Sequence, residues 1–121
     1  VVMPVFNEEE VLPQTFARLR ALFDANSQFR WRSVLVNDGS RDGSLDVMME
    51  QAAQNPNIKV VNFARNFGHQ IAVTAGINAA RGDILVLIDA DLQDPPECIP
   101  EMVAQWREGA AVVRVTEVVR L

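Results

Sequence analysis

Two carboxylates, Asp89 and Asp91, follow directly after an apolar run over residues 84–88. The run predicts a strand buried on both faces, and the two acids, two positions apart, would point to the same side of the chain. Burying unpaired charges is costly, so the pair favours a divalent cation or a ligand bridged by one. Asp91 is the better candidate for a direct metal ligand, with Asp89 reaching a ribose or the metal shell. Gln93 adds an amide oxygen, and such hard donors suit Mg²⁺ or Mn²⁺.

An Asp-x-Asp triplet is a weak signal by itself, because solvated acidic turns are common. No HxxxH or CxxC spacing supports zinc. The glycine-rich GxGxxG and GxxxxGK[ST] phosphate loops are also missing from the sequence. A nucleotide bound at this place would therefore depend on a metal to neutralise its diphosphate.

A second polar segment, Asn-Asp-Gly-Ser at residues 37–40, follows another apolar run. One interpretation is an ordinary turn in which Ser40 or Asp42 caps the next helix. In the other, the Asp38 carboxylate accepts hydrogen bonds from the N–H groups of a nucleobase. Uracil and guanine both offer such donors, so the base stays open.

A third polar segment ends the first apolar run, at residues 4–10. It can be a capping box, with Asn7 at the helix cap and Glu10 three positions later. Alternatively, the backbone from Pro4 to Phe6 packs along a base, and Glu8 accepts a hydrogen bond from the base or the ribose.

A fourth polar segment, residues 65–70, lies between an expected strand and an expected helix. Arg65 is a candidate cation for a diphosphate. His69, the only histidine, can be a general base, but a histidine at a helix start next to a glycine is more often a cap or a packing element.

The composition is that of one globular domain: 121 residues, 49% of them hydrophobic. The net charge of -5 argues against binding nucleic acid or anionic lipid through overall charge. The single cysteine, Cys98, excludes an internal disulfide and fits a reducing compartment. No apolar run approaches the ~20 residues of a membrane span. Because residues 1–5 already read as the middle or end of a strand, we expect the chain to be part of a longer protein.

Strand-like runs alternate with helical patterns along the whole chain. The alternation predicts an α/β fold with right-handed crossovers and a mostly parallel sheet flanked by helices on both faces. The polar segments lie at the carboxyl ends of strands, where open parallel sheets bind ligands. The expected strands are residues 1–5, 33–36, 58–63, 84–88 and 110–119, and the expected helices are residues 8–25, 43–54, 70–81 and 96–108.

Together the polar segments resemble the motifs of family 2 glycosyltransferases. They are most similar to the dolichyl or polyprenyl phosphate hexosyltransferases, the dolichol-phosphate mannose synthase type, and the DLQDPPE stretch after the first acid favours that branch. The resemblance covers about residues 1–109. Its motifs are PVFNEE (4–9), NDGSRDGS (37–44), RNFG (65–68) and DADLQDPPE (89–97).

The resemblance implies a GT-A fold, the Rossmann-like fold of nucleotide-diphospho-sugar transferases. Residues 1–121 would form the nucleotide-sugar-binding part of a single glycosyltransferase domain, with the acceptor part beyond them. The donor would be a UDP- or GDP-sugar. By this resemblance the base and ribose are lined by Pro4, Phe6, Glu8 and Asp38, the metal and diphosphate are held by Asp89, Asp91 and Gln93, and the catalytic acids are Asp89 and Asp91.

The same resemblance implies inverting transfer of a hexose to a dolichyl or undecaprenyl phosphate at the cytoplasmic side of the membrane. Membrane contact would come through parts absent from this chain, which alone is expected to be soluble. Where the family continues from residues 111–113 into an arginine-containing acceptor loop, this chain has residues 114–121 and ends. A transferase acting on a polysaccharide or another glycan, or a nucleotide-sugar-binding module without turnover, are the alternatives.

Overall fold

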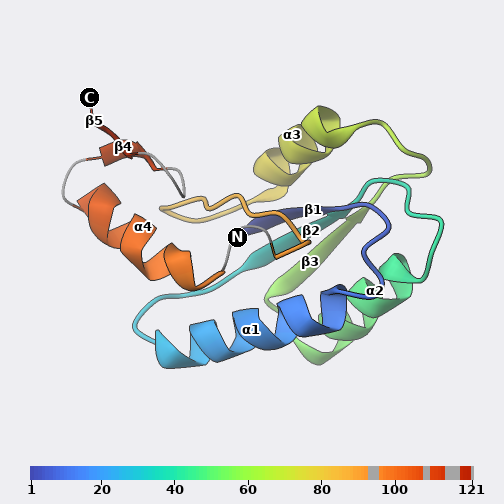
Figure 1. The fold of residues 1–121 in the computed structure, drawn as a ribbon, viewed down its shortest axis with the longest axis horizontal. Helices are drawn as coiled ribbons and strands as arrows, with labels where there is room; N and C mark the ends of the chain where they lie inside the picture. Colours follow the sequence, from blue (N-terminus) through green and yellow to red (C-terminus); the bar gives the residue numbers. More distant parts are fainter. Residues whose placement is uncertain (93–95, 108–109, 114–117, 121) are drawn as a thin grey trace.

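The computed structural model describes residues 1–92, 96–107, 110–113 and 118–120 (Figure 1). Strands and helices alternate over residues 2–79, which confirms the predicted α/β class. The elements are β1 (Val2–Val5), α1 (Leu12–Ala25), β2 (Ser33–Asn37), α2 (Ser44–Gln54), β3 (Ile58–Asn62), α3 (His69–Ala79), the 3-10 turn η1 (Pro96–Cys98), α4 (Ile99–Arg107), β4 (Ala110–Val113) and β5 (Val118–Arg120).

The sheet is parallel and has β2 at its centre, between β1 and β3. On its other side, β1 meets the segment before the acid pair: the Val2 N–H donates to the Val86 carbonyl at 2.7 Å, and the Ile88 N–H donates to the Val2 carbonyl at 3.1 Å. The sheet therefore grows first on one side of β1, through β2 and β3, and then on the other side, through the segment before the acid pair. Such a reversal of strand order opens a crevice at the carboxyl ends of the strands, where ligands bind in open α/β sheets.

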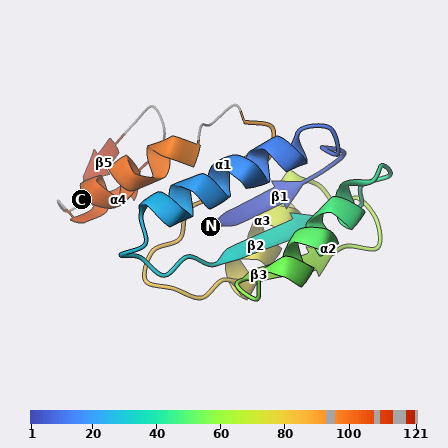
Figure 2. The same cartoon turned by 90° about the horizontal axis from the view of Figure 1, so that it is seen from below.

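Helices cover both faces of the sheet, as predicted. In Figures 1 and 2, α1 and α2 lie on one face and α3 lies on the other. The larger core cluster includes Met3 and Leu35 of the sheet, Leu19 of α1, Met48 of α2 and Ile99 of α4, so it joins the sheet to these three helices. The smaller cluster joins Val2, Val34 and Val36 to Ala72 of α3.

The expected fourth strand over residues 84–88 is only half formed. A single parallel bridge, between Val2 and Leu87, is assigned to it. Ile88 is buried, but Leu85 and Leu87 are 43% and 42% exposed, so the prediction of a strand buried on both faces was wrong. Alternate side chains of the run face the larger core, and the others stay exposed because α3 packs over β1 and β2 instead.

The first helix begins later than the sequence suggested. α1 starts at Leu12, has Pro13 in its first turn, and shows no side-chain cap. The predicted capping box between Asn7 and Glu10 was therefore wrong. Asn7 adopts a left-handed conformation, with φ 52°, and its Oδ1 accepts the N–H of Arg41 at 2.8 Å instead.

The last strands pair with each other and not with the parallel sheet. β4 and β5 are antiparallel, with Val112 opposite Val119. The expected strand over residues 110–119 thus becomes two, and residues 114–117 between them lie outside the described part of the chain. Among the helices that the structure describes, none is long and apolar enough to cross a bilayer.

Candidate functional site

A cavity of about 500 Å³ opens at the carboxyl edge of the sheet. The loops that follow β1, β2 and β3 come together at this edge (Figure 1). Seven side chains singled out from the sequence lie in its wall, although they come from four separate segments of the chain. The lining includes Pro4, Phe6, Glu8, Asp38, Asn66, Gly68, His69, Asp89 and Asp91.

Hydrogen bonds join the loop after β1 to the loop after β2. The Asn7 N–H donates to Ser40 Oγ at 3.0 Å, and the Glu8 N–H donates to Ser44 Oγ at 2.8 Å. Glu9 adds two more bonds, from its N–H to Asp42 and from the Gly43 N–H to its carboxylate. These bonds fix the backbone on both sides of Glu8, whose side chain lines the cavity.

The segment over residues 37–40 is both a turn and part of the cavity wall. Buried Asn37 organises the turn: its Oδ1 accepts the Ser40 N–H at 3.1 Å, and its Nδ2 donates to Asn62 at the end of β3 at 2.8 Å. Asp42 accepts the N–H of Ser44, the first residue of α2, at 2.9 Å, as expected for an ordinary turn.

Asp38 is nearly buried, with 4% of its surface exposed. Its Oδ1 accepts the Phe67 N–H at 2.8 Å, and its Oδ2 accepts the Asn66 amide at 3.2 Å. The sequence did not assign roles to Asn66 or Gly68, although both line the cavity. The RNFG motif carried the signal for both, but asparagine and glycine are less typical of active-site chemistry than the arginine before them and the histidine after them.

The acidic side of the cavity carries concentrated negative charge. Asp89 and Asp91 are half-buried. The pKa of Glu8 is raised by burial, then by the charge of Asp91 and of Asp42. The described residues contain no cage of three or more His, Cys, Asp or Glu side chains. Two carboxylates still fit Mg²⁺ or Mn²⁺, which take few protein ligands and complete their shell with phosphate oxygens and water.

Three other predicted positions have different outcomes. Gln93 lies outside the described residues. Arg65 is not among the described residues lining the cavity, and its guanidinium lies over the Phe67 ring, 4.5 Å from the centroid. His69, which the sequence favoured as a cap or packing element, lines the cavity as the first residue of α3. The proposed contact of Arg65 with a diphosphate stays a prediction.

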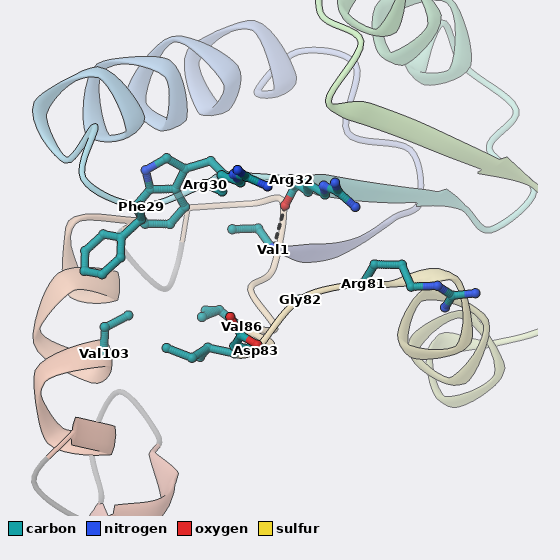
Figure 3. A pocket seen from close by; sticks show the side chains of 11 residues that line it. Val1, Phe29, Arg30, Arg32, Arg81, Gly82, Asp83, Val86 and Val103 are labelled. Carbon is teal, nitrogen blue, oxygen red and sulfur yellow. Dashed lines mark hydrogen bonds between the residues drawn. The ribbon is translucent and has the colours of Figure 1, made fainter.

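A second cavity, of about 320 Å³, lies at the opposite, amino edge of the sheet. Arg30, Arg32 and Arg81 are part of its lining. Figure 3 shows Arg81 extending away from Phe29 and Val103, so the three guanidinium groups do not converge on one point. Both its position and this divergence distinguish it from the carboxyl-edge cavity, which gathers the predicted side chains.

Comparison with known proteins agrees with this geometry. The sequence model of glycosyl transferase family 2 matches residues 1–120. The chain belongs to glycosyl transferase family 2. The match spans every segment of the carboxyl-edge cavity, so the predicted family resemblance is confirmed.

Curated glycosyltransferases match this chain at more than a third of the aligned positions. It is 48% identical to the uncharacterized glycosyltransferase YkcC of Bacillus subtilis, over 93% of this chain and 35% of the relative. It is 39% identical to the prophage bactoprenol glucosyl transferase homolog of Escherichia coli, over 93% of this chain and 37% of the relative. It is 43% identical to the undecaprenyl-phosphate 4-deoxy-4-formamido-L-arabinose transferase of Shewanella sediminis, over 90% of this chain and 33% of the relative. The chain spans about a third of each of these relatives. The names of the second and third agree with the polyprenyl phosphate branch.

A solved structure has the same fold. Staphylococcus aureus TarS, residues 1–349 in complex with UDP, superposes with a TM-score of 0.61 over 84% of this chain and 32% of TarS, at 23% sequence identity. This likeness and the family 2 match confirm the expected GT-A fold.

Proposed function

We propose that this chain is the donor-binding part of a metal-dependent inverting glycosyltransferase that moves a hexose from a UDP- or GDP-sugar to a polyprenyl phosphate. The observation that carries the proposal is the convergence of Pro4, Phe6, Glu8, Asp38 and the Asp89–Asp91 pair on one cavity at the carboxyl edge of the sheet. The family 2 match supports glycosyl transfer.

The base and ribose would lie between the β1 and β2 loops. Phe6 is 44% exposed and offers an apolar surface to a base. Asp38, at the buried side of the cavity, can accept from a base N–H with the acceptor capacity that its two internal bonds leave, because an ionised carboxylate has about four lone-pair sites. Glu8 would accept from a ribose hydroxyl or from the base.

Asp89 and Asp91 would bind the diphosphate through a divalent cation. When bound, Mg²⁺ or Mn²⁺ neutralises the charge that develops on the diphosphate as the sugar leaves. The two carboxylates fix the position of that positive charge, and Gln93 is the predicted third oxygen donor. Their contribution is therefore both to bind and to orient the leaving group.

The acceptor assignment rests on the names of the relatives, which include bactoprenol and undecaprenyl-phosphate transferases. A polyprenyl phosphate is anionic near neutral pH, so its attack on the sugar depends mainly on positioning and needs no strong base. His69 therefore has no required role as a general base, although it lines the cavity.

Titration calorimetry on the natural full-length protein containing these residues tests donor binding. UDP or GDP should bind more tightly with Mn²⁺ than without it, and Asp91→Ala should reduce the Mn²⁺-dependent affinity at least about tenfold. Asp83→Ala is the matched control, because Asp83 lines the amino-edge cavity and should leave affinity unchanged.

Unchanged Mn²⁺-dependent affinity in Asp91→Ala, with its circular dichroism spectrum also unchanged, would mean that the metal site is wrongly assigned. A radiolabelled sugar nucleotide offered together with polyprenyl phosphate and a soluble glycan tests the acceptor. Label in the organic phase supports the lipid phosphate, whereas label in the glycan supports the alternative acceptor.

A further inference from the structure

Asp38 and the loop after β3 form one hydrogen-bonded unit. The side-chain amide of Asn66 donates to Asp38 twice, to its backbone carbonyl at 3.1 Å and to Oδ2 at 3.2 Å. The Phe67 N–H donates to Oδ1 at 2.8 Å. Both carboxylate oxygens are thus held from the side of the 65–67 loop.

The orientation of the Asn66 amide follows from the chemistry of its partners. A backbone carbonyl and an ionised carboxylate only accept hydrogen bonds, so the NH₂ group of Asn66 must face them. The amide oxygen then points elsewhere. The Asn66 side chain therefore donates hydrogen bonds to Asp38. An aspartate at position 66 would have the same shape but could only accept hydrogen bonds there.

Backbone packing holds the same two loops together. Gly39, next to Asp38, adopts φ +71°, and a Cβ built on it would overlap the backbone atoms of Arg65 and Asn66. Only a residue without a side chain permits this approach. The loop after β3 is consequently fixed against Asp38 by contact as well as by hydrogen bonds.

We propose that Asn66 is a positioning residue that orients the Asp38 carboxylate for a nucleobase imide N–H. The inference rests on the proposed function and deepens it, because it names the group that sets how the base is read. In this role Asn66 itself would not contact the nucleotide. It acts by fixing the rotation of Asp38, so that the acceptor capacity left on the carboxylate faces the cavity.

The test compares three ligands on the natural full-length protein: UDP or GDP, whichever binds; the same nucleotide methylated at its imide nitrogen; and pyrophosphate with Mn²⁺. Wild type should bind the methylated nucleotide at least about tenfold more weakly, the usual scale for losing a hydrogen bond to a charged group. Asn66→Asp and Asn66→Ala should weaken the unmodified nucleotide about tenfold and leave pyrophosphate unaffected. In both variants the penalty for methylation should shrink.

Asn62→Asp is the matched control. Asn62 accepts from Asn37 through its Oδ1, so a carboxylate there keeps the bond, and the methylation penalty should equal that of wild type. The inference would be overturned if the wild type bound the methylated and unmodified nucleotides equally well, or if the Asn66 variants lost as much affinity on methylation as the wild type does. Either result would leave the proposed function standing. A wild type that binds neither nucleotide would overturn both.

Discussion

At the scale of single residues, one glycine decides how two loops of the site meet. Gly39 combines a left-handed backbone with direct packing on the backbone of residues 65–66. The sequence revealed the turn through its Asp-Gly-Ser pattern, which is local chemistry. It did not reveal Asn66 as a partner of Asp38, because that bond joins residues 28 positions apart and depends on how β2 and β3 align.

Gly39→Ala should lower the free energy of unfolding by about 2 kcal/mol or more, since the backbone strain of a left-handed residue adds to the overlap. Urea denaturation measures the loss. Gly82→Ala is the control, because Gly82 also has positive φ but a Cβ there meets nothing closer than 3.7 Å. Equal losses in the two variants would show that packing against the loop contributes nothing.

At the scale of elements, close helix-to-sheet contact and one ion pair set the positions of α3 and η1. α3 approaches β1 through Gly76, where an added Cβ would overlap the side chain of Val2. On the other face, Arg18 of α1 binds Glu97 of η1 through two bonds, at 2.9 Å and 2.6 Å. Helix starts were the hardest element feature to predict, because Asn7 bonds to another loop and not to its own helix.

Gly76→Ala should destabilise the protein although alanine is a better helix former by about 1 kcal/mol, because fully buried Val2 cannot move away. Val2→Ala alone should cost about 1–3 kcal/mol. The double variant should lose at least about 1 kcal/mol less than the two single losses together. Thermal or urea unfolding of all four proteins gives this coupling, and simple additivity would contradict the contact.

The bond from Arg18 lowers the pKa of Glu97 below its usual value. A carboxyl group with a lower pKa in the folded state stabilises the fold above its unfolded pKa, and this contribution is lost as the pH falls through the folded pKa. Glu97→Gln should therefore reduce the urea midpoint near neutral pH, and this effect should fade as the pH falls below the usual glutamate pKa of about 4.3 and through the lower folded pKa. A difference that persists unchanged in acid would assign the loss to packing of residue 97.

At the scale of the whole molecule, the alternation of apolar runs and helical patterns was enough to predict the α/β class and the edge that carries the site. β2 is buried along its length, and its run of β-branched and apolar residues is unambiguous. The 84–88 run looked the same in sequence, but its burial depends on which neighbours cover Leu85 and Leu87. That information lies in the packing of α3 and not in the run itself.

The two edges of the sheet also differ in how freely they accept new sequence. At the amino edge, the turn between α2 and β3 exposes Pro56 and Asn57. Two local bonds close it, from the Ile58 N–H to the Asn55 carbonyl and from the Asn57 N–H to Asn55 Oδ1. Exposed turns of this kind tolerate insertions. A fluorophore or affinity tag inserted there would report on the protein without touching the loops of the carboxyl edge, which makes this turn the natural place to attach a label.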